Sequence, residues 1–215
     1  MKHLLAGTAI AALLVIGTPV ADAAVILTMG QTGGTNTITA TNPTANTTHI
    51  AGSAVPVTIT EIDAGIATPV AATLTLSADS VGLATSTGGF ATQAFTGSFS
   101  ITNGATNYLS GTFTDAVFGS GTALTLAASN GSAGQSVSFT SNVIAASQLG
   151  NPLGIALSFT NVTPPVGTTG NPATIAAFTA AVSGDFSANP VPEPATLALL
   201  GVGLLGLGMV RARRR

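Results

Sequence analysis

Few side chains in the body of this 215-residue chain could carry out acid–base or metal chemistry. Between residues 24 and 189 there is a single histidine, and it is accompanied by five acidic residues: His49, Glu61, Asp63, Asp79, Asp115 and Asp185. A histidine oriented by a carboxylate can activate a serine, two carboxylates can hydrolyse a glycosidic bond, and several carboxylates can hold Ca²⁺. Each of these chemistries requires the residues to converge in the fold.

The surroundings of His49 do not favour catalysis. It lies in a polar stretch at residues 47–50 that reads as a loop, and the body contains no Cys, Lys or Arg to serve as a nucleophile or an oxyanion clamp. Ser and Asp are present, so a Ser-His-Asp triad remains an alternative. The sequence predicts a surface histidine, no catalytic residue and no enzyme activity.

Glu61 and Asp63 are separated by one residue, so they share one face of the end of a predicted strand. They are weak candidates for Ca²⁺ ligands, or for a glycosidase pair with Asp79 or Asp115. Acids at this spacing are usually only solvated. Platforms for sugar stacking are scarce, because Tyr108 is the single tyrosine and tryptophan is absent. We expect no metal and no cofactor.

The distribution of charge excludes one class of partner. Only 6% of residues are charged, and the five basic ones lie at the extreme ends: Lys2, Arg211, Arg213, Arg214 and Arg215. A body without Lys or Arg cannot neutralise phosphates, which excludes nucleic acid. It also predicts no internal ion pair. Cysteine is absent, which rules out disulfides and thiolate metal sites.

Apolar residues alternate with Thr and Ser along the body, as in half-buried strands. Val55, Val57 and Ile59 interleave with Thr58 and Thr60, and the pattern recurs at residues 74–76, 95–101, 124–126, 137–139, 155–159 and 178–186. Turn signals such as Gly33-Gly34, Asn103-Gly104 and Asn130-Gly131 separate these segments. The sequence predicts an all-β fold with no helix inside the body.

Many short strands favour an antiparallel β-sandwich, jelly-roll-like in topology. A β-solenoid is the alternative, although no repeat of fixed period is present. The solvent faces carry Thr and Ser where most sandwiches carry Lys and Glu, so the edge strands lack protective charge. Self-association or contact with sugars is a consistent role for such faces.

The N-terminus has the three parts of a secretory signal peptide. Lys2 gives a positive start, residues 4–16 are almost wholly apolar, and Ala21 and Ala23 suit signal peptidase. We predict cleavage between Ala23 and Ala24, and therefore a signal peptide at residues 1–23. An uncleaved anchor is the alternative, but the apolar run is shorter than the roughly 20 residues of a spanning helix.

The C-terminus joins a rigid acidic tripeptide, Pro192-Glu193-Pro194, to an apolar run and a basic tail. Residues 195–210 would form a helix of about 24 Å, which can span a membrane marginally. The closing residues Arg211, Arg213, Arg214 and Arg215 would remain cytoplasmic. Two prolines keep the tripeptide extended and outside the helix. On these physical grounds alone, a plain membrane anchor is an equal alternative.

The order and spacing of these three parts resemble the PEP-CTERM sorting signal of Gram-negative bacteria that make exopolysaccharide. The resemblance covers about the last 25 residues. It implies that Pro192, Glu193 and Pro194 are recognised by an exosortase, that residues 196–210 are a transient transmembrane anchor, and that the Arg cluster retains the chain until the tail is removed.

These observations predict three parts: a signal peptide at 1–23, a Thr/Ser-rich β-sandwich at 24–189 and a sorting signal at 190–215. The expected partners are signal peptidase, exosortase, the inner membrane as a transient anchor and an exopolysaccharide. We expect an exported surface or matrix protein with a non-enzymatic structural or adhesive role. A carbohydrate-binding module and a secreted hydrolase are the alternatives.

Overall fold

A computed structural model describes residues 23–35, 37–88, 90–119 and 124–189. Within these ranges there is no α-helix, and the single 3₁₀ turn, η1, covers Ala146–Gln148. None of the described helical segments is long and apolar enough to cross a membrane. The strands are β1 Ala24–Gln31, β2 Ile38–Thr44, β3 Thr47–Ile62, β4 Val70–Ser80, β5 Thr85–Thr87, β6 Phe90–Asn103, β7 Thr106–Gly119, β8 Leu124–Ser129, β9 Ser136–Thr140, β10 Gly150–Thr163, β11 Thr168–Thr169, β12 Thr174–Ile175 and β13 Phe178–Asn189.

The prediction of an antiparallel all-β fold is confirmed, since every strand pairing in the described chain is antiparallel. The alternation seen in the sequence corresponds to burial. In β3, Val55, Val57 and Ile59 are at most 1% exposed, whereas Thr60 faces solvent. The antiparallel pairing is not that of a β-solenoid. The predicted terminal helices lie outside the described residues.

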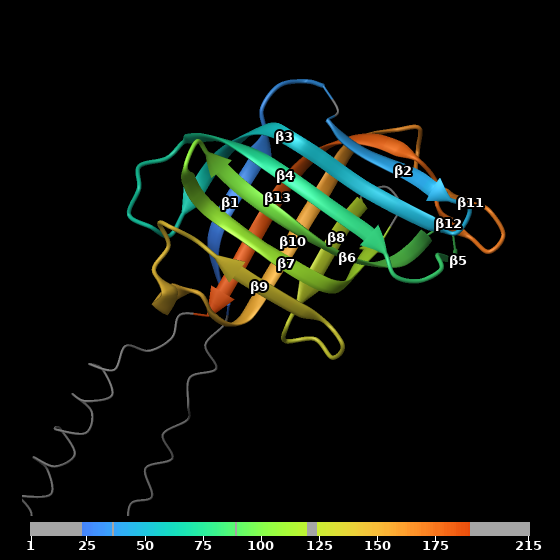
Figure 1. Cartoon of the computed structure of the whole chain (residues 1–215). Coiled ribbons are helices and arrows are strands. Elements are labelled where there is room, and N and C mark those ends of the chain that lie inside the picture. Colours follow the sequence, from blue (N-terminus) through green and yellow to red (C-terminus); the bar gives the residue numbers. More distant parts are fainter. Residues whose placement is uncertain (1–22, 36, 89, 120–123, 190–215) are drawn as a thin grey trace, which may run out of the picture.

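The strands form two packed layers that are continuous with each other. The front layer of Figure 1 contains β3, β4, β6, β7 and β9, and the back layer contains β1, β13, β10 and β8. Pairing runs in the order β6, β4, β3, β1, β13, β10, β8 and β7, and β7 pairs again with β6. The predicted two-layer sandwich is therefore one sheet folded onto itself, which leaves few strand edges open.

β1 and β2 act as one interrupted strand. β1 pairs with the C-terminal half of β13 and the C-terminal part of β3, and β2 pairs with the opposite halves of the same two strands. Ala24 lies opposite Ala188, so both ends of the domain emerge from one end of the sandwich. We call this the terminal end. β5, β11 and β12 lie at the opposite, far end.

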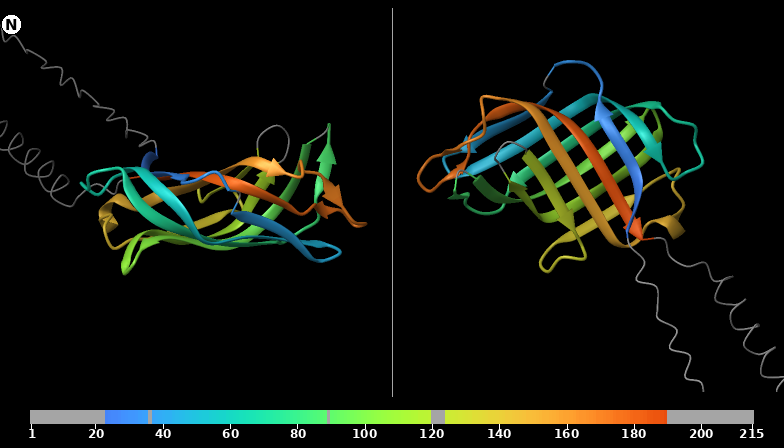
Figure 2. Two further views of the ribbon diagram at one scale, coloured as in Figure 1. Left: turned by 90° about the horizontal axis from the view of Figure 1, so that it is seen from above. Right: turned by 180° about the vertical axis from the view of Figure 1, so that it is seen from behind.

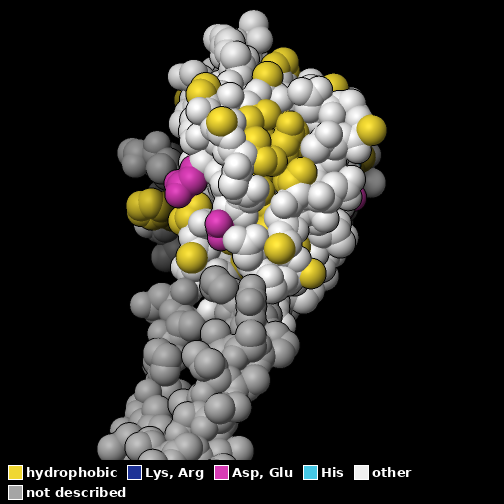
Figure 3. Space-filling view, turned by 90° about the vertical axis from the view of Figure 1, so that its left-hand side faces the viewer, with side chains coloured by type: hydrophobic (Ala, Val, Ile, Leu, Met, Phe, Trp, Pro, Cys, Tyr) yellow, Lys and Arg dark blue, Asp and Glu magenta, His cyan; other side chains and the backbone are white. Residues whose placement is uncertain are grey.

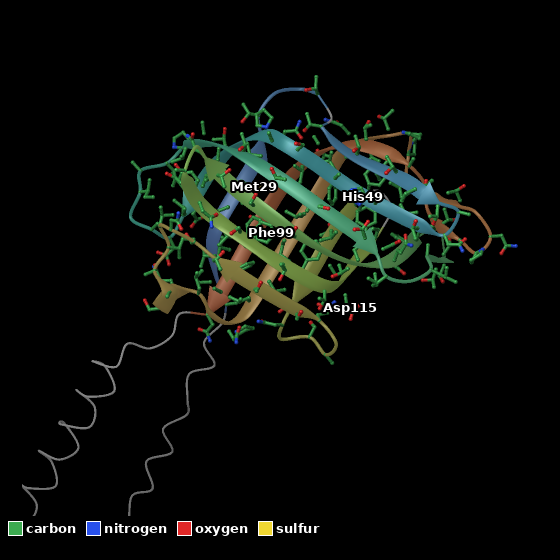
Figure 4. The ribbon with its side chains drawn as sticks, viewed as in Figure 1. Met29, His49, Phe99 and Asp115 are labelled. Carbon is green, nitrogen blue, oxygen red and sulfur yellow. The ribbon has the colours of Figure 1, made fainter. Side chains whose placement is uncertain are left out.

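Phenylalanine dominates the core between the layers. Phe118 of the front layer packs against Phe159 and Phe178 of the back layer, with ring centroids 5.6 and 5.9 Å apart, and also against Phe95. A second cluster nearer the terminal end joins Phe99 to Phe139 and Phe186. Figure 4 shows Phe99 and Met29 in this region of the interior. These contacts tie the two layers into one core.

A buried polar cluster closes the far end of the core. The Gln93 side chain accepts a hydrogen bond from Ile175 N at 3.0 Å and donates to Gly82 O at 2.7 Å and Thr174 Oγ1 at 3.0 Å. Thr48 Oγ1 lies 2.6 Å from Thr174 Oγ1. The cluster joins β3 and β6 of the front layer to the connection between β10 and β13. All three polar side chains, Thr48, Gln93 and Thr174, are at most 2% exposed.

One local expectation was wrong, and one strand was not predicted. Residues 47–50 belong to β3 and not to a loop, because Thr48 and Ile50 are buried while His49 faces outward. Residues 106–119 form the long strand β7, which no alternating pattern in the sequence predicted. Gly111 and a bulge with a positive φ at Asp115 interrupt its alternation. A Cβ on Gly111 would overlap the carbonyl oxygen of Ser138, so glycine is required there.

Candidate functional site

His49 meets a carboxylate on the outer face of the front layer. It lies directly opposite Asp79 of β4, and His49 Nδ1 is 2.7 Å from Asp79 Oδ1. The side chains are 33% and 66% exposed. The predicted surface histidine is therefore partnered. When His49 is protonated the two form an ion pair, which corrects the expectation that the body contains none; that expectation counted His49 as neutral.

The His49–Asp79 pair resembles the base and orienting groups of a hydrolase, but it lacks the rest of such a site. Within the described chain, no hydroxyl forms a hydrogen bond to His49 Nε2, so no activated nucleophile is present. The pair lies on an open sheet face. The surface has one groove on the outer face of the back layer and another beside β2. Neither groove is lined by His49 or Asp79.

Asp115 lies in the same cross-strand row as the pair. Asp79 is opposite Thr96 of β6, and the bulge in β7 places Thr114 and Asp115 beyond Thr96. Two strand spacings, about 10 Å, therefore separate the backbones at Asp79 and Asp115. Both acids are exposed, and Figure 4 shows His49 and Asp115 apart on this face. Without walls around them, they do not enclose a water for glycoside hydrolysis.

Glu61 and Asp63 lie near the terminal end, where both are exposed. Asp63 N donates to Ile26 O of β1, which fixes the backbone after β3. About 40 Å of strand separates Glu61 from His49, so these acids do not converge with Asp79. In the described ranges no group of three His, Cys, Asp or Glu residues is placed to hold a metal ion. Among the described residues, the pair therefore gains no third carboxylate or imidazole ligand.

Tyr108 does not provide a sugar platform, because it is only 9% exposed and packs in the core. The one strongly exposed aromatic of the described residues is Phe90, at the start of β6. The criterion that would have favoured an aromatic carbohydrate-binding module, an exposed tyrosine beside acids, is therefore not met.

The most regular feature of the surface is an array of hydroxyl groups on the front layer. It has three members on β4, four on β6, three on β7 and three on β9, all pointing outward between buried residues. We call this array the hydroxyl face, and it consists of Thr73, Thr75, Ser77, Thr96, Ser98, Ser100, Thr102, Ser110, Thr112, Thr114, Ser136, Ser138 and Thr140.

Strand register aligns these hydroxyls in rows across the layer. One row runs through Ser77, Ser98, Thr112 and Ser138, each opposite the next. The neighbouring row has the same form and consists of Thr75, Ser100, Ser110 and Thr140. The sequence predicted Thr and Ser on solvent faces, but not these rows, because register follows from strand pairing.

Hydrogen bonds order one half of the hydroxyl face. Between β7 and β9, the hydroxyl oxygens of Thr112 and Ser138 lie 2.8 Å apart, and those of Thr114 and Ser136 lie 2.6 Å apart. Between β4 and β6 the contacts are looser. Among the described residues, the hydroxyls of Ser77 and Ser98 have no hydrogen-bond partner, so they are available to a ligand.

The outer face of the back layer is different. A shallow, open groove crosses β8, β10 and β13 toward the terminal end and is largely apolar, with Ala127, Ala156, Gly154 and Val25 among its lining residues. Asp185 and Ser187 supply polar atoms at its floor. Figure 3 shows another part of the surface, the left-hand side of Figure 1, where hydrophobic side chains gather in a band and acidic side chains lie beside it.

The sorting and cleavage residues of the sequence prediction fall at the ends of the chain. Pro192, Glu193, Pro194, the four C-terminal arginines and Ala21 lie outside the described residues. Ala23 is exposed, and β1 begins at Ala24. The predicted cleavage point therefore falls immediately before the first strand, and it remains a prediction.

Comparison with known proteins identifies one region of the chain. Residues 190–215 match the PEP-CTERM protein-sorting motif, which confirms the resemblance read from the sequence. A motif of this kind implies an exported protein that is anchored in a membrane and then processed by an exosortase. No curated protein and no solved structure matches the chain.

Proposed function

We propose that this protein is delivered to the cell surface or the extracellular matrix, where the β-domain has a non-enzymatic structural or adhesive role. The observation that carries the proposal is the PEP-CTERM motif at residues 190–215, placed directly after the last strand, which ends at Asn189. In this proposal, signal peptidase removes residues 1–23 and an exosortase removes the C-terminal tail.

The geometry of the domain supports this route. Ala24 and Ala188 are paired neighbours, so both processing points leave from the terminal end. A chain anchored by its tail would hold this end toward the membrane and would direct the far end outward. The hydroxyl face lies along the side of the domain, between the two ends, and stays exposed in either the anchored or the released form.

A structural role is also consistent with the chemistry of the body. His49 and Asp79 meet on an open face, and the remaining acids are spread over the domain. The body has no Lys, Arg or Cys with which to form a nucleophile, a Schiff base or an oxyanion clamp. The single sheet folded onto itself instead provides a rigid module with few open edges.

Processing is tested with Glu193→Ala and with a variant in which Arg211, Arg213, Arg214 and Arg215 are all replaced by Ala. Each is expressed in a host that has an exosortase, and cell fractions are analysed by mass spectrometry of the mature ends. We expect both variants to accumulate as unprocessed precursor in the membrane fraction, whereas the native chain loses residues beyond the Pro-Glu-Pro region.

Two control variants isolate the motif. Glu61→Ala also removes a glutamate carboxylate, but from an exposed position on β3 outside the motif. This variant should be processed normally. Replacement of the four arginines by Lys keeps the positive charge and should also preserve retention. Mature-sized Glu193→Ala protein outside the membrane fraction, or a native surface form that keeps residues 196–210, would refute the proposal.

A further inference from the structure

The hydroxyl face forms a two-dimensional lattice. Neighbouring strands lie about 4.8 Å apart, and outward residues on one strand repeat every 6.6–6.8 Å or so. Because Ser77, Ser98 and Thr112 are in direct register, the rows run straight across the strands. A lattice of this kind suits a ligand that itself repeats its hydrogen-bonding groups at regular intervals.

The part of the lattice on β7 and β9 is ordered before any ligand arrives. Threonine is stiff at χ1, and the pairs Thr112–Ser138 and Ser110–Thr140, each 2.8 Å apart, hold their hydroxyls in place. A hydroxyl has one donor and two acceptor sites, so a paired hydroxyl still has capacity for a ligand. Binding to such a surface loses little side-chain entropy, which favours many weak contacts acting together.

Charge narrows the class of ligand. The described residues contain no Lys or Arg, and the only charged groups in the rows of the hydroxyl face are Asp79 and Asp115 at one border. A polyanion would be repelled there and would find no Lys or Arg among the described residues. These charges argue against a polyanion, and a neutral, repetitive ligand that forms hydrogen bonds along its whole length fits the face.

Edge-to-edge association with a second copy of the chain is opposed, because the adjacent strand edge is blocked. β9 is the outer strand of this layer, but Asn130 donates from Nδ2 to Val137 O at 3.3 Å on that edge. The same side chain accepts a hydrogen bond from Leu153 N at 2.6 Å and thereby joins β9 to β10. The Asn130 side chain therefore occupies the open edge of β9 and opposes strand addition, by which uncharged edges usually associate.

We propose that the hydroxyl face binds extended, neutral polysaccharide chains. The inference rests on the proposed function, because that function brings the domain to the cell surface or the extracellular matrix. Ser98, Ser100 and Thr112, which belong to the two complete rows, form the centre of the contact. Binding depends on hydrogen bonds, and for that reason it is only weakly sensitive to salt, unlike binding to a polyanion.

The test compares two triple variants of the full chain, purified in detergent. Ser98→Ala, Ser100→Ala and Thr112→Val remove central hydroxyls and preserve shape. The control, Thr125→Val, Ser158→Ala and Ser183→Ala, removes an equivalent cross-strand row from the back layer. Particles of insoluble β-glucan, α-glucan and galactomannan are the neutral probes, with polygalacturonate as the anionic one. Circular dichroism checks that all variants remain folded.

We expect the native chain to sediment with at least one neutral polysaccharide. The front-face triple variant should lower the affinity for that polysaccharide about tenfold or more, since each lost hydrogen bond contributes about 1 kcal/mol. The back-face triple should bind within twofold of the native chain. Equal losses in both triples, preference for polygalacturonate, or no binding to any neutral probe would overturn the proposal.

Two further outcomes would also overturn it. Adsorption to ice crystals without adsorption to glycans would assign the lattice to ordered water, and concentration-dependent self-association abolished by the front-face triple would assign it to a second copy. The proposed function is tested separately, by measuring whether the C-terminal tail is removed. If glycan binding fails while the tail is still cleaved, only the assignment of the hydroxyl face falls.

Discussion

The two outer faces of this sandwich cover the same core with different chemistry. On the front layer, thirteen hydroxyl side chains point outward from four strands, and eight of them form two complete rows, one of which is Ser77, Ser98, Thr112 and Ser138. On the back layer, Ala127 and Ala156 are directly opposite each other and line a shallow groove. Both faces alternate with the same kind of buried aliphatic and aromatic residues.

The difference separates what folding requires from what it leaves free. The back layer mixes Ala and Gly with hydroxyl residues such as Thr125, Ser158 and Ser183, so a complete set of hydroxyls is not required on a solvent face of this fold. A continuous set of hydroxyl rows on the front is therefore not demanded by the core. Exposed Thr favours strands, but propensity alone does not place a hydroxyl at the same register on four neighbouring strands.

The largest effect should come from removing the core contact that both faces share. Phe118 packs against Phe95 of its own layer and against Phe159 and Phe178 of the other. Phe118→Ala should lower the free energy of unfolding by about 3–5 kcal/mol, because it opens a cavity between the layers. Urea unfolding, monitored together with hydrogen exchange in β9 and β10, measures the effect on both faces.

Phe90→Ala is the control for this experiment. Phe90 is 61% exposed at the start of β6, and its removal should change stability by no more than about 0.5 kcal/mol. If β9 and β10 unfold in separate transitions in the Phe118 variant, the layers do not share one core, and the comparison of their faces loses its basis.

The next largest effect should come from the polar cluster that joins the front layer to the far-end connection of the back layer. Gln93→Leu would leave Ile175 N, Gly82 O and Thr174 Oγ1 without their present partner. We expect a loss of about 1–3 kcal/mol, since buried polar groups without hydrogen bonds are costly. Thr92→Val, on the exposed side of the same strand, should be nearly neutral; similar losses in both variants would contradict the assignment.

Much of the fold could be predicted from the sequence, because alternation reports burial directly. Leu74 and Leu76, or Ile155 and Leu157, are apolar at every second position and are buried as expected. The strand β7 was not predicted, because Gly111 and the bulge at Asp115 interrupt its alternation of apolar and polar residues. Its partners β6, β8 and β9 supply the pairing that holds it in the sheet, and pairing is a tertiary effect.

The surface was less predictable than the core. The abundance of Thr and Ser indicated a hydroxyl-rich exterior, but a row such as Thr75, Ser100 and Ser110 is visible only once three strands are in register. The meeting of His49 with Asp79 was hidden for the same reason, because thirty residues separate them in the chain. The sorting signal, by contrast, is linear and could be read without any fold.

A smaller effect is expected from the hydroxyl rows themselves. The front-face triple, Ser98→Ala, Ser100→Ala and Thr112→Val, should change the free energy of unfolding by less than about 1 kcal/mol, since a cross-strand hydroxyl pair contributes only a few tenths. The back-face triple should behave alike. Denaturant unfolding of both proteins checks this, and a front-face loss above about 2 kcal/mol would show that folding requires the rows after all.

The smallest effect is expected at the border of the hydroxyl face. Asp79→Asn removes the carboxylate that pairs with His49, but both groups are partly or largely exposed, so the change in stability should be about 0.5 kcal/mol. Asp185→Asn on the back layer, where no histidine is opposite, is the control. Added salt should erase the difference between the two variants because it screens exposed charges. A salt-resistant loss of about 2 kcal/mol confined to Asp79→Asn would mean that this pair, rather than the ordered hydroxyls, fixes the front layer, and the contrast between the faces would then be electrostatic in origin.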